Sequence, residues 1–458
     1  MYVAVKTRQQ VAAAGGKVTV DFYLINEKNV RGNHQLKISV TDSQGKVMEV
    51  GTYETEAAGG EVYGQLLVKD VKIPVPTAGG LCRIEAKLCK ENSVVTTGYD
   101  DILSVNLASN MLDGKGAVWE DGSALQNFLK GKTKEAVAAY EDNLGKLDWI
   151  MVARPPRKDQ LTMVPMEALR SADGKPGLDV VYYEDMEFQK EVYHEVAKVV
   201  NLSAIEGATP SPFVYMLDGY GIKWSGKVLP SVSGEYTIIP QSNDRSMIEV
   251  FVNGKKIYEI TRKKEHLGDG KVYLEGGKSA DIEIRFRHPR SNARCRLDWA
   301  VPNDKMPDAQ RLMERAVNDG TKIFIIQSAD EWSEFIAANS KAVFKDKFFV
   351  GTNWLGGVMF NKPHDIFKEL PVGNALNWPY QALIHTGVER MGLVMEGEEL
   401  LVGAYHTYPM AIGTAMGIVP MGKGSVLFST LDIYGNIIND SAAGLVAKKL
   451  IFNMIDFK

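Results

Sequence analysis

The sequence has few cysteines, and their positions argue against disulfide bonds. Cys82, Cys89 and Cys295 are odd in number and too few for a disulfide framework. Cys82 and Cys89 stand seven residues apart in a strand-like segment, which places their sulfurs on opposite faces and too far apart to bond. Free thiols favour a reducing compartment, but some exported bacterial proteins also lack disulfides, so cysteine content leaves the location open.

Long apolar runs and blocks of one charge sign are also missing. No segment approaches the ~18–20 apolar residues that span a bilayer, and the first residues enter strand-like sequence without a signal-peptide core. The 458 residues include 53 Lys and Arg against 57 Asp and Glu, a net charge of −4, with no long basic stretch. We therefore expect no membrane span, no export signal in this chain and no nucleic-acid partner.

Length and hydrophobic periodicity predict about three domains in a mostly β chain. From Lys17 to about Leu107, apolar and polar residues alternate, and Gly-rich turn signals separate the runs. About a hundred residues of short alternating strands are typical of a small sandwich of two sheets. We predict an immunoglobulin-like β-sandwich over residues 1–107.

Strands and helices alternate in the next part, which predicts a doubly wound α/β domain. The rhythm stops after the apolar strand 148–153 and resumes near residue 304. Ser328 and Glu331 then predict a capping box before an apolar helix. We interpret residues 108–171 and 303–458 as two parts of one interrupted α/β domain.

The interrupting segment is again β. Residues 281–287 and 294–299 alternate strictly, and residues 252–255 form a two-residue hairpin signal. We predict an inserted β-sandwich over residues 172–302. Four outward arginines could form a basic face for an acidic glycan or could simply be solvated strand residues. They are Arg285, Arg287, Arg294 and Arg296.

The motifs of this insertion resemble, in order and spacing, the β-sandwich domain first named from anthrax protective antigen. The motifs are Gly177–Tyr183, Trp224–Gly226, Ser233–Thr237, Val252–Gly254 and Leu297–Trp299. That family occurs in glycosidases, adhesins and toxins and often binds carbohydrate. The resemblance therefore implies that carbohydrate is a partner of this chain.

The same resemblance raises the question of calcium. In the calcium-dependent lectin members, two consecutive aspartates in a loop hold the ion, and here Asn243 and Asp244 stand at that place. Because Asn243 stands in place of an aspartate, this pair is one negative charge short of the pattern. Calcium affinity falls with each lost carboxylate. A plain turn explains the two residues equally well. Asp244 is the candidate calcium ligand, and no other cofactor is expected.

The flanking parts resemble pieces of bacterial glycoside hydrolase family 2, the β-galactosidase-like family. Val18–Glu27 is similar to a β-sandwich that follows the catalytic barrel, and His364–Pro371 with Ser429–Ile433 is similar to a class I glutamine-amidotransferase-like, flavodoxin-like domain. This implies a C-terminal accessory segment of a longer periplasmic or extracellular glycosidase, which packs against a catalytic barrel outside this chain. It implies β-linked, galactose-type glycans as the substrates of that parent protein.

Catalytic residues are not expected in this segment. Retaining glycosidases need two carboxylates ~5–5.5 Å apart, which in this family lie on a barrel of ~250 residues, and no such barrel is present. Adjacent acidic residues such as Glu120 and Asp121 are interpreted as solvated turn residues. Amidotransferase chemistry needs a cysteine, and all three cysteines lie outside the predicted α/β domain.

Aromatic side chains are the remaining sugar-binding candidates, because sugar rings stack on exposed aromatic faces. With Asn243 and Asp244, the candidates are Trp354, Trp378, Tyr405 and His406. Each aromatic residue could equally fill an interface with a neighbouring domain.

Three functions follow from these patterns. The first is a non-catalytic, carbohydrate-binding accessory region of a family 2 glycosidase, and the second is a stand-alone glycan-binding module or adhesin. The third is a serine hydrolase with Ser328 as nucleophile and His364, His385 or His406 as base, against which a helix-capping role for Ser328 is the alternative. Whether the chain forms homo-oligomers is left open.

Overall fold

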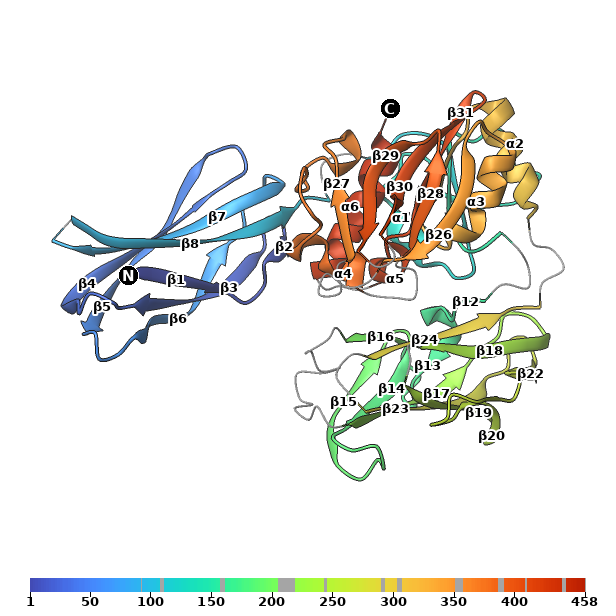
Figure 1. Cartoon of the computed structure of the whole chain (residues 1–458), viewed down its shortest axis with the longest axis horizontal. Helices are drawn as coiled ribbons and strands as arrows, with labels where there is room; N and C mark the ends of the chain where they lie inside the picture. The colour runs from blue at the N-terminus through green and yellow to red at the C-terminus, as the bar shows by residue number, and fades with distance from the viewer. Residues whose placement is uncertain are drawn as a thin grey trace. The chain divides into compact units, whose positions relative to one another are not determined.

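A computed structural model describes the chain except residues 92, 108–110, 157–160, 205–218, 243–244, 290–292, 303–306, 351–356, 386–390, 408–409, 439–441 and 458. Strands make up 52% of the chain and helices 14%, which confirms the mostly β fold class. The chain divides into two compact units, one formed by residues 1–111, 361–381 and 439–458 and the other by residues 112–360 and 382–438 (Figure 1). The helices that the structure describes are all too short or too polar to span a membrane.

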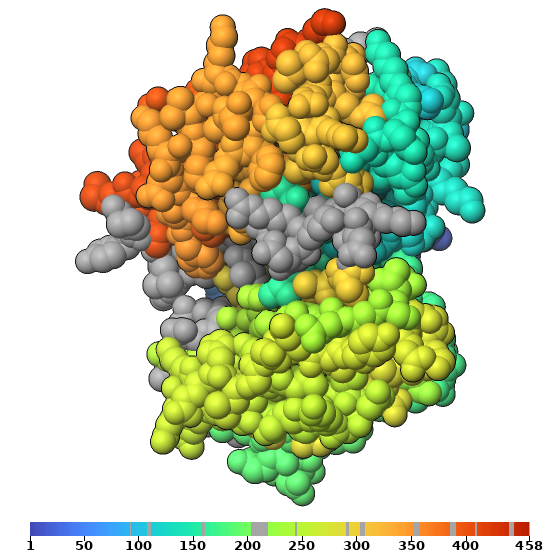
Figure 2. All heavy atoms as spheres, turned by 90° about the vertical axis from the view of Figure 1, so that its right-hand side faces the viewer, coloured from blue at the N-terminus to red at the C-terminus, as the bar shows by residue number. Residues whose placement is uncertain are grey.

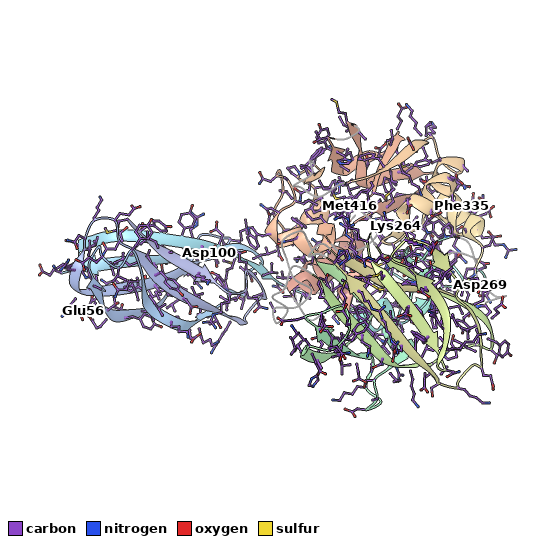
Figure 3. All side chains as sticks on the ribbon, turned by 60° about the horizontal axis from the view of Figure 1, so that its bottom comes forward. Glu56, Asp100, Lys264, Asp269, Phe335 and Met416 are labelled. Atoms are coloured by element: carbon purple, nitrogen blue, oxygen red, sulfur yellow. The ribbon has the colours of Figure 1, made fainter. Side chains whose placement is uncertain are left out.

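The first unit is built around a β-sandwich. Its smaller sheet has the strand order β1 (Tyr2–Thr7), β3 (Lys17–Ile25), β6 (Gly64–Pro74). Its larger sheet has the order β2 (Val11–Ala13), β8 (Ser93–Val105), β7 (Gly80–Lys90), β4 (Arg31–Thr41), β5 (Val47–Ala58). Figure 3 labels one side chain on each of two strands of the larger sheet, Glu56 on β5 and Asp100 on β8.

Strand β3 shows how alternation builds the core of this sandwich. Its apolar side chains are buried between the two sheets, as the period of two predicts; they are Val18, Val20, Phe22 and Leu24. Asp21 is buried as well, and it accepts hydrogen bonds from Arg8 Nη2 at 3.0 Å and from the backbone N–H of Asp70 at 2.8 Å. These partners satisfy a carboxylate that would otherwise destabilise the fold.

Segments from later in the chain complete the first unit. They are η3 (Asp365–Phe367), η4 (Trp378–Tyr380) and α6 (Ala442–Asp456). Helix α6 packs against β2, β8 and both short helices. Lys449 of α6 lies 2.6 Å from Glu369 Oε2 and donates to the carbonyl of Asn106 at 3.1 Å.

The second unit contains a ten-stranded mixed sheet. Its main order is β10 (Ala138–Ala139), β9 (Gly116–Glu120), β11 (Trp149–Ala153), β25 (Lys322–Ile325), β31 (Gly424–Ser429), β30 (Ala411–Met421), β28 (Met391–Glu396), β26 (Val343–Phe349). Beside this path, β29 (Glu399–His406) pairs with both β30 and β27 (Gly357–Asn361). The strands β9, β11, β25 and β31 are parallel, as in an α/β domain, whereas the pairs that join β30 to β31, β28 and β29 are antiparallel.

Helices connect and cover these strands. They are α1 (Ala124–Leu129), α2 (Ala309–Asp319), α3 (Ala329–Ala338), α4 (Gln381–His385) and α5 (Tyr434–Ile437). Helix α2 begins where the Asp308 side chain accepts a hydrogen bond from the N–H of Gln310 at 2.8 Å, and it stops at Gly320, whose φ is 80°. The alternation of strands and helices around the interruption therefore exists, while its amidotransferase-like character stays a prediction.

The capping box predicted for α3 is wrong. Ser328 does precede this helix, but its backbone is left-handed, with φ 54° and ψ 35°, and its side chain makes no cap hydrogen bond. An N-cap residue normally has extended backbone angles, which aim its hydroxyl at the free N–H groups of the first turn. With its left-handed backbone, Ser328 does not direct its hydroxyl at these N–H groups.

The second unit also contains a second β-sandwich. Its five-stranded sheet consists of β12 (Thr162–Met163), β24 (Ala293–Ala300), β18 (Gly234–Ser242) and β22 (Lys271–Leu274), with β16 (Asn201–Ala204) beside β24. Its eight-stranded sheet has the order β15 (Glu191–Ala197), β14 (Leu178–Tyr183), β17 (Tyr220–Val228), β23 (Ala280–His288), β19 (Met247–Val252), β20 (Lys255–Ile260), β21 (His266–Leu267), with β13 (Leu169–Arg170) beside β17. In Figure 2 this sandwich is the part drawn mainly in green and yellow-green. The predicted domain boundaries at residues 107, 171 and 302 stay predictions.

Candidate functional site

A cavity of about 340 Å³ lies on the outer face of the eight-stranded sheet. Three neighbouring strands and one turn supply its lining, which mixes an aromatic ring, a guanidinium, two carboxylates and a hydroxyl. The lining residues are Ser225, Gly226, Phe251, Gly254, Asp281, Ile282, Glu283 and Arg285.

Strand register brings these residues together. On the central strand β23, Glu283 stands opposite Ser225 of β17 on one side and opposite Phe251 of β19 on the other. Residues 281, 283 and 285 face outward because Ile282 and Ile284 between them are buried in the sandwich core.

The turn between β19 and β20 forms one wall of the cavity. Asn253 and Gly254 have φ values of 49° and 75°, and two positive values identify the mirror-image turn that a two-residue hairpin prefers. The side-chain oxygen of Asn253 accepts a hydrogen bond from the backbone N–H of Asp281 at 2.9 Å, and the Asn253 N–H donates to the Asp281 carbonyl at 2.8 Å. The predicted hairpin is confirmed, and it is tied to the start of β23.

Gly226 supplies a bare stretch of backbone in the lining. Its φ is 153°, and a Cβ atom added there would lie 2.3 Å from the carbonyl oxygen of Arg170 and 2.9 Å from Leu178 Cδ2. No real Cβ atom tolerates such distances, so this position requires glycine.

Three side chains in the cavity, which we name the cavity trio, interact directly: Arg285, Glu283 and Phe251. Arg285 Nε donates to Glu283 Oε1 at 2.5 Å, and the Arg285 guanidinium carbon lies 4.7 Å from the centre of the Phe251 ring. This combines a charge-assisted hydrogen bond with a cation–π contact. The ring and the guanidinium hold each other in place, both half-buried.

Next to the trio, Glu249 of β19 joins two basic side chains. Arg287 Nη1 lies 2.9 Å from Glu249 Oε2, and Lys256 Nζ lies 3.3 Å from Glu249 Oε1. Burial raises the pKa of Glu249, but the hydrogen bonds and charges of Arg287 and Lys256 outweigh burial, so the net pKa is below its usual range. Lys256 Nζ also lies 2.5 Å from Glu259 Oε2, so two carboxylates balance the two bases of this cluster.

The predicted basic face is wrong. Arg285 and Arg287 lie on β23 in one sheet, whereas Arg294 and Arg296 lie on β24 in the other. Arg296 makes two 2.8 Å hydrogen bonds to the buried carboxylate of Asp298. Burial lowers the pKa of Arg294, whose guanidinium lies 5.6 Å from the Phe349 ring centre. Alternation alone cannot show that two consecutive strands belong to different sheets.

The interpretation of Glu120 and Asp121 as solvated turn residues is also wrong. Glu120 accepts hydrogen bonds from the N–H groups of Leu125 and Gln126 at 3.0 Å, and burial raises the pKa of its carboxyl group. Asp121 accepts hydrogen bonds from Arg154, which is buried, and from Thr162. These carboxylates fasten the end of β9 to its surroundings and are not solvated turn residues.

Of the sugar-binding candidates from the sequence, those that the structure describes do not line the cavity. Asn243, Asp244 and Trp354 lie outside the described residues. Trp378 is half-buried in η4 of the first unit. Tyr405 and His406 are half-buried on β29 of the second unit. Within the described residues, no group of three or more His, Cys, Asp and Glu side chains could hold a metal ion.

In the described part of the ten-stranded sheet, none of the predicted histidine bases lies beside Ser328. Ser328 is buried after β25, and His406 is on β29, which lies three strands away along β31 and β30. At ~4.8 Å per strand step, strands β25 and β29 are separated by roughly 14 Å across the sheet. The side chain of His385 is outside the described residues, and His364 belongs to the other unit.

Sequence reasoning missed four lining residues: Ser225, Phe251, Asp281 and Glu283. The strict alternation of 281–287 does mark its odd-numbered residues as outward-facing. Nothing local shows that 225 and 251 flank residue 283, because those pairings join strands distant in sequence.

Comparison with known proteins agrees with the inserted sandwich. The family model described as the PA14 domain matches residues 174–311. The anti-sigma-I factor RsgI3 of Acetivibrio thermocellus is 28% identical over 127 residues, which are 27% of this chain and 19% of that protein. The chain thus spans less than a fifth of the length of this curated relative.

Two solved structures share parts of the fold at low similarity. A β-glucosidase from Kluyveromyces marxianus has 11% identity and a TM-score of 0.34, covering 49% of this chain and 30% of its own. A PA14 sugar-binding domain from an RTX adhesin has 15% identity and a TM-score of 0.21, covering 27% and 88%. At these scores neither likeness carries an argument about function.

Proposed function

We propose that this chain is a carbohydrate-binding accessory region of a glycoside hydrolase and that the cavity between β17, β19 and β23 holds the sugar. One observation carries the proposal: the cavity lies on the segment that matches the PA14 domain and combines an aromatic ring with planar polar groups. Family 2 membership of the parent and a place outside the cytoplasm rest on the sequence resemblance and belong to the same proposal.

The lining suits a sugar ring chemically. A pyranose presents C–H groups on its face and hydroxyls on its edge, so it needs an apolar surface beside hydrogen-bonding groups. The ring of Phe251 supplies the apolar surface, while Asp281, Glu283 and Ser225 supply oxygens for the hydroxyls. A volume of about 340 Å³ falls at the small end of ligand sites, which suits one ring of a longer glycan.

In this proposal the chain binds and does not cleave. The acid and nucleophile of the parent enzyme would lie on its catalytic barrel, and this chain would hold or orient the glycan. The same cavity would serve a stand-alone adhesin, and the two uses differ in whether the chain improves cleavage by an associated catalytic barrel. Purified chain should leave a chromogenic β-galactoside intact, and its hydrolysis would contradict a non-catalytic role.

A glycan array with the full chain tests the binding site. We expect binding of at least one glycan, and Phe251→Ala or Arg285→Ala should weaken it about tenfold or more, because each removes half of a stacked pair in the lining. Tyr99→Ala, on the outer surface of the first sandwich, is the matched control and should bind like the native chain. Full binding by Phe251→Ala would reject this cavity. Loss of binding in EDTA would instead place the site at a calcium ion.

A further inference from the structure

The charged groups of the cavity are unequally matched. Among the described lining residues Arg285 is the one base, and its guanidinium is engaged by the Glu283 carboxylate and by the Phe251 ring. Two carboxylates, Asp281 and Glu283, stand against this single cation. The cation is therefore already neutralised before any ligand enters.

Asp281 carries the charge that is left over. Its side chain is exposed, and its backbone is fixed by the two hydrogen bonds to Asn253. In the described part of the chain it forms no ion pair, although Lys227 faces it across the β17–β23 register. The carboxylate thus stands at the cavity lip, close to any group that a ligand places there.

The neighbouring bases do not reverse this balance. Arg287 and Lys256 both bind Glu249, and Lys256 also binds Glu259 at 2.5 Å. Lys223, opposite Arg285 in register, lies over the rings of residues 183 and 188, away from the lining. Among the described lining side chains, Asp281 is consequently the one whose charge no partner within the lining offsets.

We propose that the cavity takes a sugar ring without an acidic group and that Asp281 is the residue that excludes acidic sugars. This rests on the proposed function. A uronic acid or another carboxylated sugar would bring a negative charge beside Asp281 with no unengaged lining cation to receive it, and like charges placed together oppose binding. Neutral hydroxyls instead donate hydrogen bonds to the same carboxylate.

Matched glycan pairs measure this selectivity. The probes are galactose and galacturonic acid oligosaccharides and glucose and glucuronic acid oligosaccharides, titrated onto the full chain at low ionic strength. We expect the acidic member of the bound pair to have a dissociation constant about tenfold higher than its neutral partner. In Asp281→Asn that ratio should fall to about threefold or less, because the amide keeps the size of the side chain and loses its charge. Added salt should also reduce the ratio in the native chain.

Asp101→Asn is the matched control, because it removes the same charge beside a stacked arginine on the first sandwich and should leave the ratio unchanged. Equal or tighter binding of the acidic probes to the native chain would overturn the selectivity while leaving glycan binding intact. An unchanged ratio in Asp281→Asn would overturn the assignment of this residue. Failure to bind any of the four probes or any array glycan would overturn this inference together with the proposed function.

Discussion

The two sandwiches carry the same three-residue arrangement in different surroundings. On the first sandwich a surface trio consists of Arg83, Tyr99 and Asp101, in which the guanidinium lies 4.0 Å from the ring centre and Nε donates to the carboxylate at 2.8 Å. The cavity trio repeats both contacts. Tyr99 is 61% exposed, whereas Phe251 is half-buried in the cavity lining.

This difference shows that residue chemistry alone does not make a site. Around the cavity trio, the turn at Asn253 and Gly254 and the bare backbone of Gly226 help to form a hollow. An exposed trio shares its hydrogen bonds with water, whereas groups in a hollow can exchange water for a ligand with less competition. Enclosure is thus the feature that distinguishes the cavity trio from the surface trio.

The largest effects should come from the cores beneath the two trios. Phe286 and Phe22 are fully buried, and replacing either by alanine should cost about 3–5 kcal/mol of unfolding free energy. Phe286→Ala should abolish glycan binding as the second sandwich loosens, while Phe22→Ala should leave binding intact. Calorimetric unfolding with glycan titration measures both. Equal loss of binding in the two variants would remove the functional distinction between the sandwiches.

Glycine substitutions at the cavity should have an intermediate effect. Gly226→Ala places a Cβ against the Arg170 carbonyl and should cost about 2–3 kcal/mol, because β17 must move. Gly254→Ala meets nothing within 4 Å and should cost only about 1 kcal/mol for its left-handed backbone. Urea unfolding of the two variants tests the order, and a larger loss in Gly254→Ala would contradict it.

Lowering the pH should reduce the stability of both sandwiches, because each contains a carboxylate that is ion-paired in the folded state. The N–H of Asp70 and the side chain of Arg8 lower the pKa of Asp21, and the pKa of Glu249 is also lowered. A lowered pKa in the folded state gives stability that is present above the ordinary pKa and is lost as the pH falls through the folded value. Asp21→Asn and Glu249→Gln should therefore flatten the fall in melting temperature between about pH 7 and about pH 3. A curve as steep as that of the native chain would show that the variant's carboxylate does not stabilise the fold.

The smallest effect belongs to the surface trio itself. Arg83→Ala should cost only about 0.2–1 kcal/mol, because an exposed ion pair is screened by water and salt. Glycan binding should be unchanged, in contrast to Arg285→Ala. Thermal unfolding and the glycan array provide the two readouts. If Arg83→Ala reduces glycan binding as Arg285→Ala does, the distinction by enclosure fails.

Local patterns in the sequence predict much of the fold. Alternation marks the buried face of β3 and of β23, the Asn253–Gly254 pair marks a hairpin, and Gly320 marks the end of α2. Each of these signals acts over a few residues, because it reflects side-chain periodicity or a backbone angle that glycine favours.

The site could not be predicted in the same way. Its geometry depends on which strands become neighbours, and the pairings that bring β17 and β19 to β23 join Glu283 to Ser225, 58 residues earlier, and to Phe251, 32 residues earlier. The same limit explains why four arginines were assigned to one face although β23 and β24 belong to different sheets. Aromatic sugar-binding candidates were sought in loop-like or strand-end positions, and this criterion missed Phe251, which lies within β19.

The hydrogen bonds between Asn253 and Asp281 give the cavity a rigid frame. Because paired strands and a two-residue turn form its walls, their shape is set before a ligand arrives, and little chain entropy has to be lost on binding. A preorganised pocket of this kind changes its backbone hardly at all on association. Its selectivity would then depend on individual side-chain atoms at the lip, which can be exchanged one at a time without reshaping the pocket.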